Sequence, residues 1–295
     1  MDRLDIPGIS SPDDVAARLD AVGYLADDGL ATAVFLGLRM ARPLFLEGDA
    51  GVGKTSLAHA LARLAHADLF RLQCYEGLDA AQALYDWDFP RQLLRLRVAE
   101  AGGRIDPDTA ERDLYDRRFL VARPLLQAIE TSPSVLLVDE IDRADDEFEA
   151  FLLELLSDFA VTVPELGTIT AVTAPLVVLT SNRTREVHDA LKRRCLYHWL
   201  GHPSFDREVA IIRRRLPGAT AQLAQGVAYA AAALRQHDLL KAPGVAESID
   251  WAEALLTLGA TTMDPGLASR ALGAMLKNHE DQAKIRSMGL DVLIQ

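Results

Sequence analysis

Cysteine is scarce in this sequence of 295 residues, which contains only Cys74 and Cys195. The two lie far apart and form no C-x-x-C pair, so neither a zinc site nor a disulfide framework is expected. Long apolar runs are also lacking, because no uninterrupted stretch reaches the roughly 18 residues needed to span a bilayer. The start, MDRLDIPGISSPDD, has no basic segment followed by an apolar one. These absences favour a cytoplasmic protein with no transmembrane segment.

Positive charge is short as well. The chain has 31 Lys and Arg against 43 Asp and Glu, a formal net charge of −12. Binding to nucleic acids depends on Lys and Arg that neutralise phosphates, so we expect no nucleic-acid partner. The sequence does have 49 % hydrophobic and 25 % charged residues, which is typical of a globular protein with a sizeable core. The length suggests one large and one small domain.

The most informative segment is GDAGVGKT at residues 48–55, which follows the apolar run PLFL at 43–46. It satisfies the phosphate-loop pattern G-x-x-x-x-G-K-[ST] at every specified position. The glycines let backbone N–H groups close around phosphates, and the helix expected at about 56–64 directs its positive end at them. In this pattern Lys54 reaches the β and γ oxygens and Thr55 ligates Mg²⁺. The predicted nucleotide-binding residues of the loop are Gly48, Asp49, Ala50, Gly51, Val52, Gly53, Lys54, Thr55 and Ser56.

A second landmark is the buried-strand run SVLLV at 134–138, which ends in Asp139 and Glu140. An acid at the carboxyl end of a buried parallel strand lies at the mouth of a nucleotide site. We therefore expect Asp139 to hold Mg²⁺ through water, together with Thr55, and Glu140 to polarise the attacking water. ATP and Mg²⁺ are the cofactors that this pairing with the phosphate loop predicts.

Two further segments follow the acid pair. The strand-like run LVVLT at 176–180 is followed by Ser181 and Asn182. Asn182 is placed either to contact the γ-phosphate or the attacking water, or to end the strand by turn chemistry, and both interpretations stay open. The string LKRRC at 191–195 precedes another strand-like run, and an arginine there would be able to reach the nucleotide of a neighbouring subunit.

Together these elements resemble the AAA+ ATPases, through the strings LFLEGDAGVGKT, LLVDEIDRA, VVLTSNR and ALKRRCLYHW. These strings are similar to those of one branch of the AAA+ ATPases, the MoxR family. Within it, RLQCYEGLDAAQALYDWDFPRQLL and VPELGT resemble the MoxR-type ATPases that accompany molybdenum-containing CO dehydrogenase. The resemblance covers nearly the whole chain. It implies an α/β fold, the P-loop NTPase αβα sandwich with a parallel five-stranded sheet, followed by a small all-α lid.

The resemblance also implies roles for individual residues. It assigns Lys54 and Thr55 to phosphate and Mg²⁺, Asp139 to the metal, Glu140 to the catalytic base and Asn182 to the first sensor. It places an arginine finger, acting in trans, at Arg194, with Arg193 as a second candidate. Such a finger is worth a factor of about 10³ to 10⁵ in turnover. Hydrolysis is therefore expected to need assembly into a ring, a hexamer in this family.

One string departs from the family pattern. Where MoxR proteins carry a second sensor arginine, this chain reads SIDW at 248–251, and Asp250 cannot neutralise a γ-phosphate. Either the second sensor is absent or another residue, such as Arg270, takes its place.

The change from alternating strands and helices to helices alone predicts the domain organisation. We expect a nucleotide-binding domain at 1–203 and a helical lid at 204–295. Within the first, an insert is expected at about 78–110 and a hairpin at about 161–173. The insert carries Tyr85, Trp87 and Phe89. These aromatics either face a ring pore or client, as the resemblance suggests, or pack on the parent domain.

The resemblance implies a remodelling chaperone that hydrolyses ATP to ADP and phosphate in a ring. By analogy the client is a molybdenum hydroxylase such as CO dehydrogenase, matured with a partner that bears a von Willebrand factor A domain. A nucleic-acid-linked AAA+ motor or loader is the alternative, because arginine-then-cysteine boxes also occur in clamp loaders. A small-molecule kinase is disfavoured, since an Asp-Glu pair with a downstream Asn suits attack by water. A GTPase is disfavoured because no Asn-Lys-x-Asp string is present.

Overall fold

The computed structural model of the chain divides into two compact units. The residues that it describes are 2–3, 6–101 and 114–289. Unit 1 consists of residues 1–15, 28–46 and 58–198, and unit 2 of residues 16–27, 47–57 and 199–295. The boundary predicted after residue 203 lies between the last strand and the helices of unit 2, and a division of the chain at that point stays a prediction. Part of the insert expected at 78–110 lies outside the described residues.

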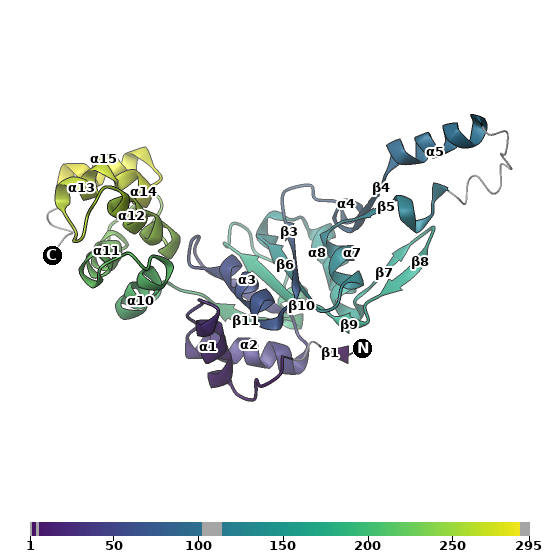
Figure 1. Cartoon of the computed structure of the whole chain (residues 1–295), viewed down its shortest axis with the longest axis horizontal. Helices are drawn as coiled ribbons and strands as arrows, with labels where there is room; N and C mark the ends of the chain where they lie inside the picture. The colour runs from purple at the N-terminus through teal and green to yellow at the C-terminus, as the bar shows by residue number, and fades with distance from the viewer. Residues whose placement is uncertain (1, 4–5, 102–113, 290–295) are drawn as a thin grey trace. The chain divides into compact units, whose positions relative to one another are not determined.

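A five-stranded parallel sheet forms the middle of unit 1, in the order β11-β2-β10-β6-β3. Figure 1 labels four of its strands, β3, β6, β10 and β11. The central strands β6 and β10 are buried along their whole length, as expected for a parallel sheet that is covered on both faces. The predicted α/β fold class, a P-loop sandwich with a parallel five-stranded sheet, is confirmed. The strands are β2 (Leu44–Glu47), β3 (Asp68–Gln73), β6 (Ser134–Asp139), β10 (Leu176–Ser181) and β11 (Leu196–Trp199).

The register of the sheet brings the ends of three strands to the same level. β3 and β10 both pair in parallel with β6, so that Gln73 lies beside Asp139 and Leu179 beside Val138. Parallel strands expose their carboxyl ends at one edge, where ligands of such folds bind. The polar side chains that end β3, β6 and β10 therefore gather at that edge.

Helices α7 (Pro124–Glu130) and α8 (Asp146–Asp158) share a hydrophobic core with the sheet of unit 1. Leu126 and Leu152 belong to this core together with Leu136 of β6. α8 begins where the Asp145 side chain accepts a hydrogen bond from the Phe148 N–H at 3.0 Å, an N-cap that favours the start of a helix. Among the residues that the structure describes, the other helices before residue 198 are α1 (Pro12–Ala21), α2 (Asp28–Met40), α3 (Lys54–Ala65), α4 (Ala80–Leu84), α5 (Phe89–Ala101) and α9 (Asp189–Arg194), with 3₁₀ turns at Arg117–Phe119 and Ile141–Arg143.

Helix α5 extends away from the sheet of unit 1 (Figure 1). It follows β4 (Tyr85–Trp87), which pairs antiparallel with β5 (Leu120–Ala122). The Trp87 ring meets the rings of Tyr85 and Tyr115 edge to face, with centroids 6.0 and 5.3 Å away, whereas Phe89 is 63 % exposed. Two of the three aromatics expected in the insert thus pack on unit 1, and the third faces solvent.

Unit 1 also contains two further small strand pairs. The strands β7 (Ala160–Val163) and β8 (Gly167–Thr170) form an antiparallel hairpin, and β8 begins at Gly167, whose φ of +84° an L residue rarely adopts. The second pair is parallel and joins β1 (Asp2–Arg3) to β9 (Thr173–Ala174). A hairpin therefore occupies the range in which the sequence predicts one.

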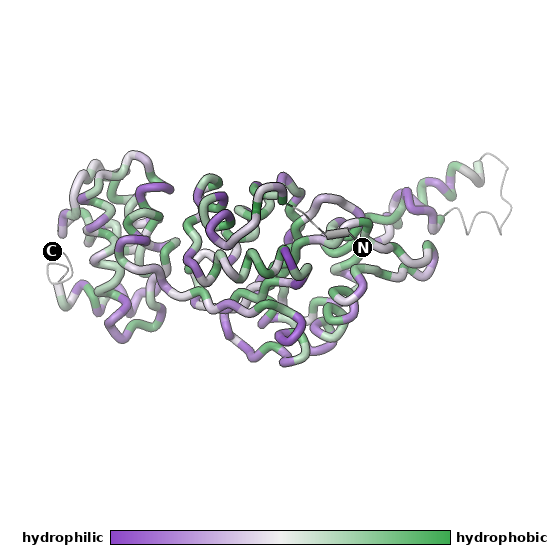
Figure 2. Tube along the Cα trace, turned by 90° about the horizontal axis from the view of Figure 1, so that it is seen from below, coloured by the Kyte–Doolittle hydropathy of each residue, from purple (hydrophilic) through white to green (hydrophobic). Residues whose placement is uncertain are grey.

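The C-terminal run of unit 2 is helical, as predicted. Its core is built around the fully buried Trp251, with Leu223, Leu255 and Leu272. Hydrophobic and hydrophilic stretches alternate along these helices, as expected for helices that bury one side (Figure 2). The helices are α10 (Phe205–Arg215), α11 (Ala221–Leu234), α12 (Val245–Thr257), α13 (Pro265–Arg270), α14 (Leu272–Met275) and α15 (His279–Met288).

Among the helices in the described ranges, none has the length and apolar character that crossing a bilayer requires.

Candidate functional site

The phosphate loop, residues 48–53, follows β2 and leads into α3, which begins at Lys54, two residues earlier than expected. Gly51 and Gly53 have φ angles of +79° and +103°, a conformation that glycine adopts without a steric penalty. Gly48 is held close to the chain that follows β11, because a Cβ at this position would lie 2.2 Å from the Leu200 carbonyl oxygen. The backbone path therefore requires glycine at the positions that the motif specifies.

The Lys54 side chain folds into the loop. It is buried, and its Nζ donates to the carbonyl oxygens of Gly48 at 2.6 Å and Asp49 at 2.7 Å. An ammonium group at the centre of the loop, beside the positive end of α3, favours a bound anion. Thr55 is half-buried in the first turn of α3, whereas Ser56, Asp49 and Ala50 are exposed.

Within unit 2, the first turn of α12 lies directly against the phosphate loop. The Ala246 N–H donates to the Gly51 carbonyl oxygen at 3.1 Å. A Cβ on Gly244 would meet the Ala50 carbonyl oxygen at 2.6 Å, and one on Gly51 would meet Glu247 Oε2 at 2.6 Å. This contact was not predicted from the sequence. The sequence feature at the contact is the pair Pro243-Gly244, which indicates only a break between two helices.

The string at 248–251 supplies no cation to the loop. Ser248 is buried and donates to Glu208 Oε1 at 2.6 Å, while Asp250 pairs with Lys277 Nζ at 3.4 Å on the exposed side of α12. Arg270, the proposed substitute for a second sensor, ends α13 and is exposed. A role for Arg270 therefore stays a prediction.

A buried ion pair lies in unit 2 close to the loop. Arg235 donates through Nη1 and Nη2 to the two carboxylate oxygens of Glu208, at 2.6 and 2.7 Å, and through Nε to the Pro243 carbonyl oxygen. His202 Nε2 lies 3.5 Å from Asp49 Oδ2. Burial, reinforced by Arg235, lowers the pKa of His202, so the imidazole beside the loop is kept neutral at neutral pH.

The predicted acid pair lies at the end of β6 in unit 1. Asp139 is buried, and its Oδ1 accepts a hydrogen bond from the Thr180 hydroxyl of β10. Its Oδ2 accepts from both Nε and Nη2 of Arg71 on β3, at 3.0 and 2.6 Å. The carboxylate is thus held from both neighbouring strands.

Glu140 follows in a left-handed conformation, with φ 57° and ψ 51°. Such a backbone is uncommon for a residue other than glycine and occurs at functional sites. It is fixed by the Glu140 N–H, which donates to Thr180 Oγ1 at 2.9 Å. The side-chain oxygens accept from Asn182 Nδ2 at 3.3 Å, Gln73 Nε2 at 3.0 Å and Arg143 Nη1 at 3.1 Å.

Asn182 therefore makes contacts that fit both interpretations of its role. Its side-chain amide meets Glu140, and its backbone N–H donates to Asp142 Oδ2 at 3.2 Å, which turns the chain after β10. Asp142 is buried and also accepts from the N–H and the hydroxyl of Thr184, at 2.8 and 2.7 Å. Asp142 lies in the DEID string but is not among the predicted site residues.

The two candidate finger arginines lie at the end of α9, and both are exposed. Arg193 pairs with Asp189 one turn earlier at 2.7 Å, and Arg194 Nη1 donates to the Leu153 carbonyl oxygen at 3.1 Å. Arg42 donates to the carbonyl oxygens of Arg193, Arg194 and Cys195, the groups that a helix end leaves without intrahelical partners.

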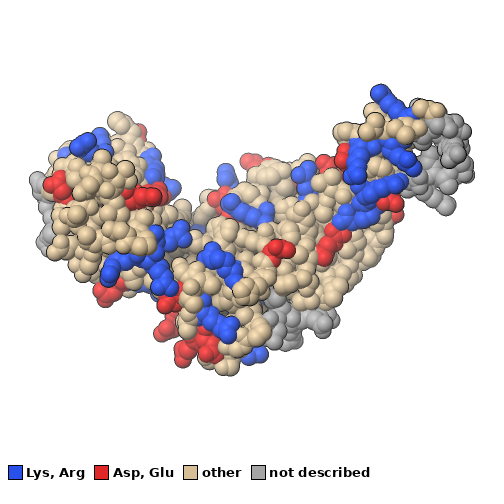
Figure 3. Space-filling view, viewed as in Figure 1, with Lys and Arg blue, Asp and Glu red and all other residues tan. Residues whose placement is uncertain are grey.

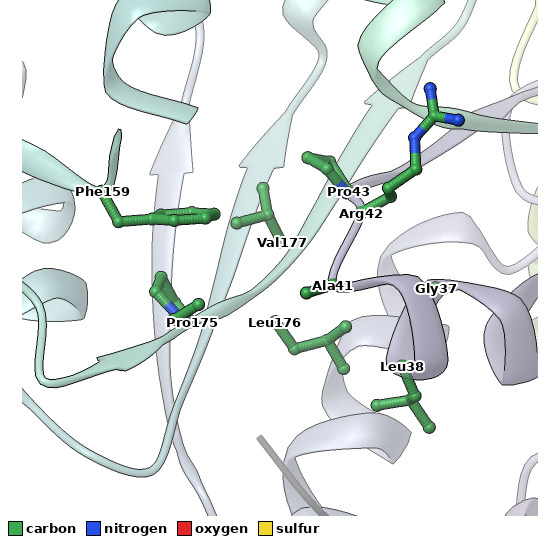
Figure 4. Close-up of a pocket in the computed structure, with 10 residues that line it drawn as sticks. Gly37, Leu38, Ala41, Arg42, Pro43, Phe159, Pro175, Leu176 and Val177 are labelled. Atoms are coloured by element: carbon green, nitrogen blue, oxygen red, sulfur yellow. The ribbon is translucent and has the colours of Figure 1, made fainter. Parts of the chain in front are cut away.

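An apolar pocket in unit 1 is too small for a nucleotide and lies away from the acid pair (Figure 4). It is found where β2 and β10 begin, the opposite edge of the sheet from Asp139, and its volume is about 20 Å³, room for about one water molecule. Figure 4 shows the Arg42 guanidinium turned away from the apolar side chains. Its lining residues are Gly37, Leu38, Ala41, Arg42, Pro43, Phe159, Ala174, Pro175, Leu176 and Val177.

The residues present fit a magnesium ion that arrives with a nucleotide. Among the described residues, no group of three or more His, Cys, Asp or Glu is arranged to hold a metal ion. Mg²⁺ needs no such group, since it is usually bound by one or two carboxylates, water and the phosphates of the substrate. The buried carboxylate of Asp139 and the hydroxyl of Thr55 are donors of that kind.

Residues 43–195 match the family model described as AAA domain (dynein-related subfamily). Among solved structures, the chain is similar to three from Thermotoga maritima, all of RuvB. One is described as the Holliday junction branch migration motor (14 % identity, TM-score 0.46, 92 % of this chain and 71 % of that chain). The other two are mutants of the same protein (15 %, 0.49, 92 % and 73 %; 14 %, 0.49, 96 % and 76 %). No curated protein matches the chain.

Proposed function

We propose that this chain, which belongs to the AAA domain family in its dynein-related subfamily, binds ATP with Mg²⁺ and hydrolyses it to ADP and phosphate. The family consists of nucleotide-hydrolysing ATPases in general. The observation that carries the proposal for this chain is the contact between Glu140 and Asn182, the two residues predicted to handle the attacking water. They lie 42 positions apart in the sequence, and the Asn182 amide donates to Glu140 Oε1 at 3.3 Å.

In this proposal the loop residues Gly48, Asp49, Ala50, Gly51, Val52, Gly53, Lys54, Thr55 and Ser56 bind the phosphates. Lys54, already inside the loop, turns its ammonium toward the β and γ oxygens. Asp139 and Thr55 would hold the metal, and bound Mg²⁺ neutralises charge on the phosphates. The strand that leads into the loop, β2, and the strand that ends in Asp139, β6, belong to the same parallel sheet.

Glu140 is proposed as the general base. Hydrogen bonds from Asn182, Gln73 and Arg143 fix the orientation of its carboxylate. A carboxylate held in this way can accept a proton from water, provided that the water lies within hydrogen-bonding reach. In this proposal the Asn182 amide, which donates a hydrogen bond to the same carboxylate, orients that water.

Substitution of the base separates binding from chemistry. Glu140→Gln is expected to bind a fluorescent ATP analogue as the wild type does and to lose turnover by a factor of about 10² or more. Lys54→Ala is expected to lose binding. Glu147→Gln, an exposed acid in the first turn of α8, is the matched control and should hydrolyse ATP normally. Normal turnover of Glu140→Gln would remove Glu140 as the base.

The finer proposal concerns what the hydrolysis does. We infer from the sequence resemblance a MoxR-type ATPase that assembles into a ring, a hexamer by analogy, with Arg194 or Arg193 completing the site of a neighbour. The ring would act as a chaperone that remodels a client metalloenzyme, a molybdenum hydroxylase such as CO dehydrogenase, with a von Willebrand factor A-domain partner. Capture of the client from the native cell by the Glu140→Gln variant, in which the ATP state persists, would test this.

A nucleic-acid-linked motor is the second candidate, and one observation favours it. Figure 3 shows Lys and Arg gathered around α5, although the chain as a whole is acidic. The exposed arginines on α5 and the adjoining segment are Arg91, Arg95, Arg97, Arg117, Arg118 and Arg123. Stimulation of the ATPase by DNA that disappears as salt is raised would support this candidate, since phosphate contacts weaken steeply with salt.

A further inference from the structure

Arg71 is the charged residue that holds Asp139, and the sequence motifs assign it no role. It is on β3, opposite Leu137 of β6 in the register, with its side chain half-exposed. Two of its nitrogens, Nε and Nη2, donate to the same oxygen, Asp139 Oδ2, at 3.0 and 2.6 Å. The exposed fraction of the Asp139 side chain is 4 %. A buried carboxylate is thus paired with a guanidinium that extends to the surface.

The remaining contacts of the pair fix where the guanidinium lies. Asp139 Oδ1 is held by the Thr180 hydroxyl, which also accepts from the Glu140 N–H, so the carboxylate cannot turn freely. Arg71 Nη2 also donates to Gln73 Oε1 at 2.6 Å, and Gln73 Nε2 donates to Glu140 Oε2 at 3.0 Å. Arg71 is therefore joined directly to one acid and through Gln73 to the other.

A magnesium ion held by Asp139 and the Arg71 guanidinium would both interact with the negative charge of the same carboxylate. A bound cation, or the polarised water through which it is held, gains from an unpaired negative oxygen, whereas Asp139 Oδ2 already accepts two charge-assisted hydrogen bonds. An opposite charge at this distance lowers the attraction of the carboxylate for a second cation. Because Arg71 reaches solvent, its guanidinium can leave without unfolding the strand.

We propose that Arg71 is a positioning residue that competes with Mg²⁺ for Asp139, so that the metal binds with its nucleotide by displacing the guanidinium from Oδ2. The inference rests on the proposed function, in which Asp139 is a ligand of the metal through water. The competition between Arg71 and Mg²⁺ sets the magnesium concentration at which the nucleotide binds.

The test measures metal-dependent binding without turnover. A fluorescent, non-hydrolysable ATP analogue is mixed with the full chain, and Mg²⁺ is titrated in. The Arg71→Gln variant is expected to reach half-maximal binding at a Mg²⁺ concentration about tenfold lower than the wild type, the factor that corresponds to one charge-assisted hydrogen bond. Binding of the analogue in EDTA is expected to be unchanged.

Arg214→Gln is the matched control. Arg214 carries the same charge and is also exposed, but it pairs with Asp20 Oδ1 and not with an acid of the site. Its Mg²⁺ midpoint is expected to equal that of the wild type, whereas an equal fall in both variants would indicate a general field effect and overturn the specific competition. Arg71→Lys, which keeps the charge but has one donor atom, is expected to give an intermediate midpoint and serves if Arg71→Gln unfolds.

Two further outcomes separate this inference from the function on which it rests. Equal midpoints in the wild type and both Arg71 variants, with the analogue bound normally, would overturn the competition and leave the proposed function intact. Loss of analogue binding by a folded Arg71→Gln protein at saturating Mg²⁺ would also overturn it, because Arg71 would then be a phosphate ligand. A wild-type chain that binds no analogue at any Mg²⁺ concentration would overturn the proposed function itself.

Discussion

Gly48 is the residue of the phosphate loop with the least space for a side chain. A Cβ would lie 2.2 Å from the backbone oxygen of Leu200, a contact that no rotamer change can relieve. We expect Gly48→Ala to destabilise the fold by about 1–3 kcal/mol, the usual range for overpacking, and to weaken binding of the ATP analogue. Denaturant unfolding measures the first effect. Gly218→Ala, where no atom lies within 4 Å, is the control and should unfold as the wild type does.

The two cysteines are a second residue-scale test. Both are buried and neither forms a disulfide, and burial raises the pKa of each thiol to about 12. Because the thiolate is the reactive form, we expect neither cysteine to react with a thiol reagent at pH 8 in the native protein. Both should react at the rate of free thiols after unfolding in urea. Rapid labelling of either one in the native state would contradict this expectation.

At the residue scale, the sequence predicts site residues only inside contiguous motifs. Lys54, Asp139 and Glu140 each lie in a short string with a known chemical purpose, whereas the sequence leaves Asn182 with two interpretations. Arg71 and Thr180 lie in the strings RLQC and VVLTSNR, but they were missed because neither motif assigns them a chemical role. Their contacts with Asp139 arise from the order in which β3, β6 and β10 lie side by side, and that order joins residues 68 and 41 positions apart.

At the scale of elements, Arg42 determines how α9 ends. Its guanidinium donates to the last carbonyl oxygens of the helix, including those of Arg193 and Arg194. We expect Arg42→Gln to cost about 1–2 kcal/mol of stability, because it leaves the last carbonyl oxygens of the helix without a charged donor, and to lower ATPase turnover by displacing Arg194. Unfolding curves and steady-state turnover measure the two effects.

The control for Arg42 is Arg213→Gln, the loss of the same charge on the exposed side of α10. It is expected to leave both stability and turnover unchanged. Reduced stability of Arg42→Gln with full turnover would show that the end of α9 does not contribute to hydrolysis.

The sequence located the elements of the site but not how they are joined. The apolar runs at 134–138 and 176–180 correspond to β6 and β10, since continuous apolar runs are typical of buried parallel strands. The helix after the loop begins at Lys54 and not at residue 56, because the first N–H groups of a helix need no partner within it. The contact between α12 and the loop could not be predicted, because it joins segments almost 200 positions apart. The apolar periodicity of α12 indicates a helix but does not show what the helix packs against.

At the scale of the whole molecule, the proposed ring can be tested by mixing two variants that are each inactive alone. We expect Arg194→Ala to bind the ATP analogue yet fail to hydrolyse ATP, and Lys54→Ala to fail at binding. Mixing the two should restore part of the activity, because an intact Arg194 from one subunit can then complete an intact loop of the other. Turnover measured across mixing ratios gives the answer, and no restoration at any ratio would count against a finger acting in trans.

The phosphate loop is tied to the helical part of unit 2 by its own backbone. Ala246 at the start of α12 donates to Gly51, and Gly244 and Glu247 fill the space around the glycines. A loop that shifts by a fraction of an ångström as it closes on an anion would have to move the first turn of α12, and with it the core around Trp251. The positions of the C-terminal helices would then depend on whether the loop holds a phosphate, and α12 would be the first of them to move when the γ-phosphate is lost.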